Sequence, residues 1–217
     1  PQGAVADRDY LERLVELAER HDFLIFADEC YSEIWRTAPP PGALAVAMGM
    51  GLGHRVIMFN SLSKRSNLPG LRSGFVAGAA EHIARLRTLR SYSGAPLPLP
   101  VQRVSAAAWN DEAHVEENRR LYRIKFDLAD QILGSRYGYK RPAGGFCVWL
   151  DVSDRGGDEA TTVRLYRDAG VRVIPGSYLA REQNDGSNPG AGYIRLALVS
   201  DSESTAEAMH RLVETLG

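Results

Sequence analysis

The stretch SLSKRSNLPGLRSG, residues 61–74, decides how the rest of the chain is interpreted. A strand is expected before it at Arg55–Phe59, and a second strand after it at Ser73–Gly78. The turn between them contains one lysine, Lys64, which suits an amine held beside a phosphorylated ligand. Polar surface loops share this composition, so the stretch alone leaves both interpretations open. The groups that could hold a phosphate are Ser61, Ser63 and Arg72, although Ser63 could instead only shape the turn.

A second stretch favours the ligand interpretation. Phe23–Ala27 is an apolar run of strand length, followed by Asp28 and, three residues later, by Tyr31. In open α/β sheets, ligands bind outside the carboxyl ends of the strands, so both side chains are expected at the same edge as Lys64. The edge would then hold an acid, a phenol, a lysine and an arginine. This set of groups suggests pyridoxal phosphate as the ligand.

Each of these groups has a distinct role toward pyridoxal phosphate. Lys64 would form the covalent Schiff base, and Asp28 would pair with the pyridinium nitrogen so that the ring acts as an electron sink. As the carboxylate closing an apolar strand, Asp28 is expected to be buried and to need such a partner. Tyr31 would hydrogen-bond the ring's 3-oxygen, and Arg72 would bind the phosphate bidentately. The structural alternatives are a surface lysine, a helix-capping aspartate, a core tyrosine and a surface ion pair.

Four segments, taken in order, resemble the fold-type I aminotransferases of class I and II. They are DECY at 28–31, SLSK at 61–64, LPGLRSG at 68–74 and YIRL at 193–196. The resemblance implies an α/β fold: the C-terminal part of a large, mostly parallel-sheet domain in residues 1–117, and a small α/β C-terminal domain in residues 118–217. It also implies pyridoxal 5′-phosphate as cofactor, amino acid and 2-oxo acid substrates, and a homodimer with the active site at the subunit interface.

Arg195 is a candidate group for binding the substrate. It lies between Ile194 and Leu196 in an expected strand, and an arginine among apolar neighbours is rarely buried without a partner. A substrate carboxylate would match its planar fork, with an internal ion pair as the alternative. Because Arg195 is far from Lys64 in the sequence, the site would span both domains. Domain closure would then depend on binding of the carboxylate.

Further blocks resemble the N-succinyldiaminopimelate aminotransferases of bacterial lysine biosynthesis. They lie at residues 60–78, 107–115, 175–181 and 188–190. This resemblance implies transamination of N-succinyl-LL-2,6-diaminopimelate with 2-oxoglutarate as acceptor. The sequence leaves open an aminotransferase for another donor: alanine, an aromatic amino acid or unacylated diaminopimelate. It also leaves open a regulatory domain that binds pyridoxal phosphate without turnover.

The chain opens with Pro1-Gln2-Gly3, where the family has a turn preceded by an asparagine that contacts the cofactor. The resemblance therefore implies the C-terminal half, or somewhat more, of an aminotransferase. A polypeptide of only these residues is expected to bind pyridoxal phosphate weakly and not to transaminate, because it lacks part of the expected cofactor site.

Composition excludes several classes of function. The formal net charge of −1 favours neither nucleic acid nor an anionic membrane as partner. No apolar run approaches the length of a transmembrane helix. The two cysteines, Cys30 and Cys147, fit a reduced cytoplasmic setting as the default. The histidines lie apart and have no Cys or Asp at ligand spacing, so no metal site is expected.

Periodicity predicts the remaining elements. Helices are expected at 7–21, 43–53, 80–91, 101–109, 111–133, 159–170 and 202–216, and strands at 144–152, 171–174 and 193–199. Asp7 is the expected N-cap of the first helix, and Gly170 is expected to end the helix that begins at residue 159. Ile83, Leu86 and Leu89 are expected to face inward.

Overall fold

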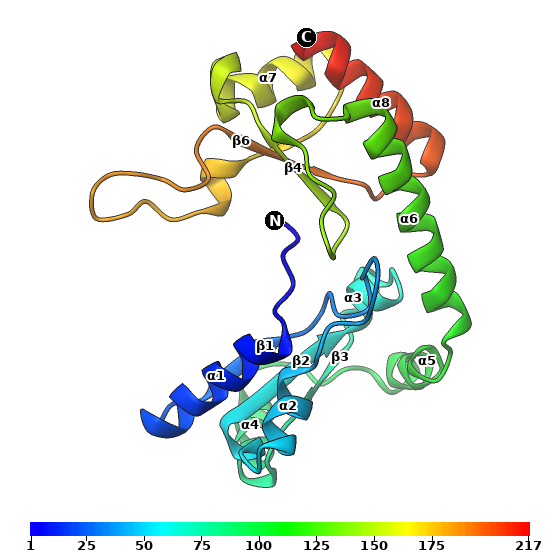
Figure 1. The fold of residues 1–217 in the computed structure, drawn as a ribbon. Helices are drawn as coiled ribbons and strands as arrows, with labels where there is room; N and C mark the ends of the chain where they lie inside the picture. Colours follow the sequence, from blue (N-terminus) through cyan, green and yellow to red (C-terminus); the bar gives the residue numbers. More distant parts are fainter. The chain divides into compact units, whose positions relative to one another are not determined.

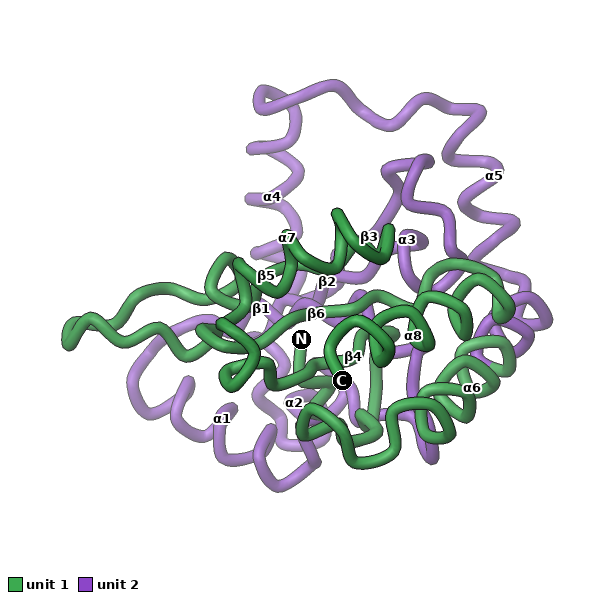
Figure 2. The backbone as a smooth tube through the Cα atoms, turned by 90° about the horizontal axis from the view of Figure 1, so that it is seen from above, with its two compact units in different colours: residues 1–4, 120–217 green, residues 5–119 purple.

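The computed structural model describes residues 1–217 as two compact units (Figure 2). Unit 2 is Val5–Arg119, and unit 1 combines Pro1–Ala4 with Arg120–Gly217. Helix α6, Ala113–Leu133, contains the boundary between the units. Each unit has its own three-stranded sheet and its own hydrophobic cluster.

The sheet of unit 2 has the strand order β1-β2-β3 (Figure 1). Strand β1, Ile25–Asp28, runs parallel to β2, Val56–Ser61. Strand β3, Gly74–Ala77, returns antiparallel to β2. The carboxyl ends of β1 and β2 therefore lie at one edge, as the sequence predicts, and the polar turn at residues 61–74 begins there.

Helices α1 and α2 build the core of unit 2. Asp7 caps α1, Arg8–Arg20, because its carboxylate accepts the Tyr10 N–H at 2.8 Å, which confirms the expected N-cap. Helix α2 covers only Ala43–Gly49, shorter than expected, since Gly51 takes a positive φ of 75° and the chain turns. The buried residues of this cluster are Leu11, Val15, Ala43, Val46, Ala47 and Val56.

Helix α4, Ala80–Tyr92, corrects one prediction. None of its residues is buried, and Leu89, expected to face inward, is 59% exposed. Its apolar residues recur every three positions, and three residues fall about 60° short of a full turn of an α-helix. Leu89 therefore lies about 120° around the helix from Ile83, and Ile83 and Leu86 are only partly buried. Helix α5 follows at Leu99–Trp109.

Unit 1 has an antiparallel sheet in the order β4-β6-β5. Strand β4, Cys147–Asp151, begins later than expected because Gly145 has a positive φ of 77°. Strand β6 covers Tyr193–Ala197. Strand β5 contains only Ile174 and Pro175; the expected strand residues Val171 and Val173 are buried without pairing in the sheet.

Three helices cover one face of this sheet: α6, α7 at Asp158–Ala169, and α8 at Ser202–Leu216 (Figure 1). Gly170 ends α7 with a left-handed φ of 66°, as predicted. The strand residues in the common core are Val148, Leu150, Ile194 and Leu196. Side chains alternate along a strand, so Arg195 lies on the opposite face. No helix of either unit is long and apolar enough to cross a membrane.

Candidate active site

The carboxyl edge of the unit 2 sheet brings the predicted lysine and phenol together. Ser61 ends β2 and is also the N-cap of the one-turn helix α3, Leu62–Arg65, which carries Lys64. Tyr31 follows β1 at the same edge, and the Lys64 Nζ lies 5.7 Å from the centre of its ring. The register, with Asp28 opposite Phe59, brings the end of β1 beside the end of β2.

Hydroxyl groups organise the start of this turn. Ser61 Oγ accepts the Ser63 N–H at 3.1 Å and lies 2.9 Å from Ser63 Oγ. It also lies 3.1 Å from the Ser73 carbonyl oxygen, which accepts the Leu62 N–H as well. A hydroxyl has one proton to donate, so Ser63 donates to Ser61 when Ser61 donates to the carbonyl. Both predicted phosphate-binding serines thus belong to one hydrogen-bonded group.

Arg72 lies at the far end of the same turn. It follows the 3₁₀ turn Pro69–Leu71, has a left-handed backbone with φ 52°, and donates from Nη1 to the Pro69 carbonyl at 2.8 Å. Its side chain is exposed. Gly70 lies in open space, because no protein atom lies within 4 Å of a Cβ placed there. At Gly74, by contrast, a Cβ would clash with the Asn60 carbonyl, so glycine is required there.

Asp28 is exposed, which corrects the expectation of a buried carboxylate. Strand β1 is the edge strand, and Phe26 on the same face is 67% exposed. The Asp28 carboxylate accepts the Cys30 N–H at 3.1 Å. Burial and the neighbouring Asp28 raise the pKa of the Cys30 thiol to about 11, while Lys64 acts in the opposite direction. The thiol is therefore neutral at physiological pH.

Glu29, next to Asp28, has a different role that the sequence analysis missed. Its carboxylate accepts the Ala43 N–H at 2.7 Å and so caps the start of α2, where Gly42 has no side chain to do so. Burial raises the pKa of Glu29, against the opposing effect of that hydrogen bond. No sequence signal linked Glu29 to α2, because its partner is 14 residues away.

Arg195 belongs to unit 1. It occupies the central strand β6, opposite Trp149 of β4 and Ile174 of β5. Its Nε is buried and has no hydrogen-bond partner. Nearby, Trp149 stacks on Tyr193 with ring centres 5.3 Å apart. The Arg195 guanidinium lies on the sheet face without helices, and its unpaired Nε–H can donate a hydrogen bond to a carboxylate.

The groups of unit 2 fit pyridoxal phosphate. An amine, a phenol and a carboxylate lie at one sheet edge, and the adjoining turn offers two hydroxyls and an arginine. Residues 61–74 contain no acidic side chain that would repel a phosphate. Taken together, these groups can hold a phosphorylated aldehyde with a basic ring nitrogen.

Comparisons with known proteins point to the same chemistry. The family model described as aminotransferase class I and II matches residues 1–212. The chain belongs to this family. Class I and II aminotransferases depend on pyridoxal phosphate, and the structures similar to this chain have the fold-type I architecture. The predicted family, fold class and cofactor are thereby confirmed.

Individual relatives are aminotransferases with different printed descriptions. An aminotransferase structure from Neisseria meningitidis is 44% identical, with a TM-score of 0.91 over 100% of this chain and 55% of its own. An LL-diaminopimelate aminotransferase of Moorella thermoacetica is 33% identical over 100% of this chain and 54% of its own length. A probable N-succinyldiaminopimelate aminotransferase structure from Thermus thermophilus is 30% identical, with a TM-score of 0.86 over 100% of this chain and 56% of its own. The chain spans about half the length of the relatives it matches.

Proposed function

We propose that the natural full-length protein is an aminotransferase in which Lys64 binds pyridoxal phosphate and moves the substrate proton. The observation that carries the proposal is the position of Lys64. It lies at the carboxyl edge of the sheet, with Tyr31 5.7 Å from its amine and the Ser61–Ser63 pair in the same turn. Asp28 ends the neighbouring strand.

The residues divide the chemistry among them. When bound, the cofactor supplies an electron sink for negative charge at the substrate's α-carbon. Lys64 would hold the cofactor through its amine, and the same amine would serve as the base that takes the substrate's α-proton. Asp28 holds a proton on the ring nitrogen, and Tyr31 donates to the ring oxygen. The groups that bind the phosphate are Ser61, Ser63 and Arg72.

Arg195 is the proposed group that binds the substrate's carboxylate. Its planar fork binds the α-carboxylate that every amino donor and 2-oxo acid acceptor carries. In this proposal residues 1–117 are the C-terminal part of the large cofactor-binding domain, and residues 118–217 are the small domain.

The proposed donor is N-succinyl-LL-2,6-diaminopimelate, with 2-oxoglutarate as acceptor. The support is the block-level resemblance in the sequence and the similarity to the Thermus thermophilus and Moorella thermoacetica proteins. Donors such as alanine, an aromatic amino acid or unacylated diaminopimelate are the second candidates. A regulatory domain that binds the cofactor without turnover is the third.

We also propose a cytoplasmic homodimer. No disulfide joins Cys30 and Cys147, which fits a reducing compartment. Helices α4 and α5 and the loop that joins them expose large apolar side chains, among them Tyr92 at 85%. Apolar surface of this kind favours association. The others in this segment are Leu89, Leu99 and Val104.

An amino-donor panel tests the proposed function. The full-length protein is supplied with 2-oxoglutarate and, in turn, N-succinyl-LL-diaminopimelate, LL-diaminopimelate, alanine and phenylalanine, and glutamate formation is measured. The succinylated donor is expected to have the highest kcat/KM. A stronger preference for another donor moves the function to the second candidate, and bound cofactor without turnover of any donor favours the regulatory domain.

A further inference from the structure

A buried arginine follows the lysine directly. Arg65 is only 4% exposed, although arginine is among the residues least often buried without partners. Its guanidinium donates to the Ala108 carbonyl at 2.8 Å and to the Trp109 carbonyl at 3.4 Å, and it forms an ion pair with Glu112. It also lies 5.0 Å from the centre of the Trp109 ring. One side chain thus joins α3 to the end of α5 and to the segment that starts α6.

The residue after Arg65 is tied to the same place. Ser66, 7% exposed, has its hydroxyl 2.8 Å from His114 Nε2, and His114 Nδ1 lies 2.7 Å from the Asp111 carboxylate. The hydrogen bond from His114 lowers the pKa of Asp111, with the Ala113 N–H adding to the effect. The order serine, histidine, aspartate occurs in hydrolases, but this serine is buried and cannot reach a substrate. The chain of bonds therefore has a structural role.

A third connection joins residues 65 and 67 of the turn to Asn118 of α6. Asn118 donates from Nδ2 to the Arg65 carbonyl at 3.3 Å, and its Oδ1 accepts from Asn67 at 3.2 Å. Three consecutive residues, 65–67, are thus held by the segment 111–118. All of these residues belong to unit 2.

These hydrogen bonds restrain the backbone that directly follows Lys64. Helix α3 is a single turn and has too few internal hydrogen bonds to fix its own orientation. Successive side chains on a helix are about 100° apart, so Lys64 and Arg65 point to different neighbours. Lys64 faces Tyr31, and Arg65 faces Trp109. Fixing Arg65 against α5 and α6 therefore prevents α3 from rotating and carrying Lys64 away from Tyr31.

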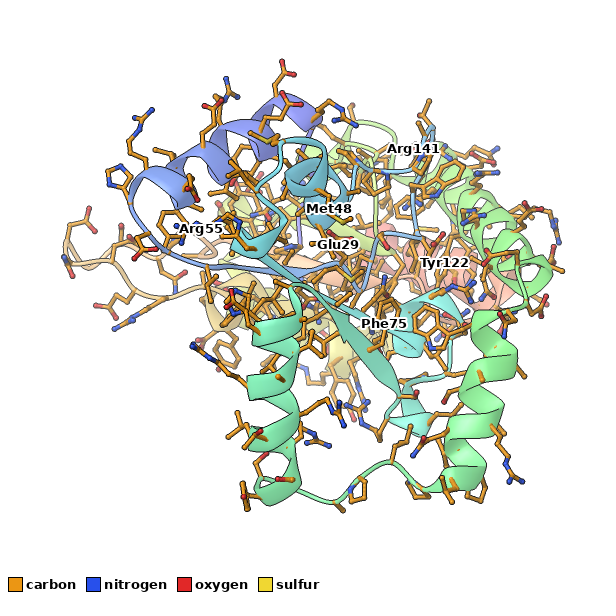
Figure 3. The ribbon with its side chains drawn as sticks, turned by 90° about the horizontal axis from the view of Figure 1, so that it is seen from below. Glu29, Met48, Arg55, Phe75, Tyr122 and Arg141 are labelled. Carbon is orange, nitrogen blue, oxygen red and sulfur yellow. The ribbon has the colours of Figure 1, made fainter.

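The packing of Trp109 supports this role. Its ring meets the Phe75 ring of β3 edge to face, with centres 4.8 Å apart, while the Arg65 guanidinium lies over it (Figure 3 labels Phe75). The Trp109 side chain, against which Arg65 packs, is therefore itself in contact with the sheet. A flexible partner would not fix the orientation of α3.

We propose that Arg65 is a positioning residue: it holds the one-turn helix α3 so that the Lys64 amine faces Tyr31 and the cofactor position. The inference rests on the proposed function and concerns the same site. Arg65 is buried, and its guanidinium is directed to Ala108, Trp109 and Glu112, so it would act through the orientation of Lys64. A misplacement of about 1 Å in such a group can reduce a rate on the order of 100-fold.

The test compares two arginines of unit 2. Arg65→Met keeps the aliphatic stem and loses the fork, and Arg65→Lys keeps the charge. Arg55→Met is the matched control: Arg55 also pairs with two groups, Glu19 and Asp22, but it precedes β2 at the end opposite Ser61 (Figure 3). Glu112→Gln perturbs the ion pair from the other side and avoids a cavity, should Arg65→Met fail to fold.

Two readouts are taken on the full-length protein loaded with pyridoxal phosphate. The first is the pH midpoint of the visible absorption band of the bound cofactor, which reports the environment of the Lys64 nitrogen. The second is the division between kcat and KM. Arg65→Met and Glu112→Gln are expected to shift the midpoint and to lower kcat on the order of tenfold or more while KM for the donor stays within about twofold. Arg65→Lys is expected to have a pH midpoint and a kcat between those of Arg65→Met and those of wild type.

The outcomes separate this inference from the proposed function. If wild type acquires no visible band that depends on Lys64, the proposed function fails. If wild type is loaded normally, but the Arg65 and Glu112 variants match Arg55→Met in both midpoint and kcat, the positioning role is overturned. A loss of folding stability in Arg65→Met with an unchanged midpoint in Glu112→Gln would also overturn it, because the arginine would then be purely structural.

Discussion

At the scale of single residues, the site depends on neighbours in sequence with different partners. Lys64 faces Tyr31, while Arg65 is buried against Trp109. Asp28 ends β1 in an exposed position, while Glu29 caps α2. In each pair only one residue is proposed to take part in the chemistry, and the other contacts a neighbouring helix.

The Asp28 carboxylate is expected to control the cofactor's electronics more than its binding. Asp28→Asn removes the negative charge that keeps the ring nitrogen protonated but retains a side chain of similar size. Cofactor affinity should change little, while turnover should fall on the order of 100-fold or more. Absorbance titration with pyridoxal phosphate measures the cofactor affinity, and steady-state kinetics measure the turnover. Asp9→Asn on α1 is the control, and a near-normal rate in Asp28→Asn would show that this carboxylate is structural.

Arg195 is expected to act on every substrate alike. Arg195→Lys keeps the charge but loses the two parallel N–H bonds, so KM for all α-carboxylate donors should rise by an amount worth roughly 1.5–3 kcal/mol. The donor panel measures the change, with the exposed Arg172→Lys as control. An effect confined to one donor would mean that Arg195 recognises a side chain instead of the α-carboxylate.

The sequence predicts a site residue when the residues around it in the chain form a recognisable motif. It does not predict a residue whose role depends on a partner far away in the sequence. Lys64, Tyr31 and the serines follow from local motifs at strand ends, where a parallel sheet brings them together. No local motif predicts the role of Arg65, because its partner Glu112 is 47 residues away. The pair forms only once α5 and α6 pack against α3. Burial of Asp28 is predicted wrongly for the same reason: exposure depends on what covers the edge strand.

At the scale of elements, the bounds and the buried face of a helix are predicted well where its apolar residues recur with a strong helical period. They are predicted poorly for short or weakly amphipathic segments. Helix α8 matches its expected bounds, since one face carries Met209, Leu212 and Leu216 into the core. Helix α4 forms where expected but buries no residue. Strand β5 is reduced to two residues because the chain before it packs its valines into the core outside the sheet.

The cap of α2 gives an element-scale prediction about pH. Burial raises the pKa of Glu29 in the folded state, so the folded protein binds this proton more readily than the unfolded chain. The stabilising contribution of protonation is then fully present below the unfolded pKa of about 4.3 and is lost as pH rises through the folded pKa. Glu29→Gln keeps an acceptor for the Ala43 N–H and stays neutral.

Urea denaturation at pH 7 and pH 4.5 measures this effect. Wild type should gain stability relative to Glu29→Gln as the pH falls. Glu16→Gln, at an exposed position of α1, should show no comparable gain. A difference between wild type and Glu29→Gln that is the same at both pH values would mean that burial of Glu29 carries no net penalty for its charge.

At the scale of the whole molecule, the chain supplies Lys64 and Arg195 from separate compact units and spans about half the length of its relatives. The sheet of unit 2 exposes Phe26 on its edge strand and Phe75 on β3. A polypeptide of residues 1–217 alone is therefore expected to associate, to bind pyridoxal phosphate weakly and not to transaminate. Size-exclusion chromatography and cofactor titration measure this, and tight binding with measurable transamination would contradict it.

The central claim is that Lys64 is the amine that binds the cofactor. The lysines of this chain are Lys64, Lys125 and Lys140, so reduction with borohydride followed by peptide mapping can distinguish them. In the full-length protein loaded with pyridoxal phosphate, the reduced cofactor should be found on the peptide that contains Lys64 and should be lost in Lys64→Ala. Stable labelling of any other lysine in wild type, or undiminished labelling in Lys64→Ala, would contradict it.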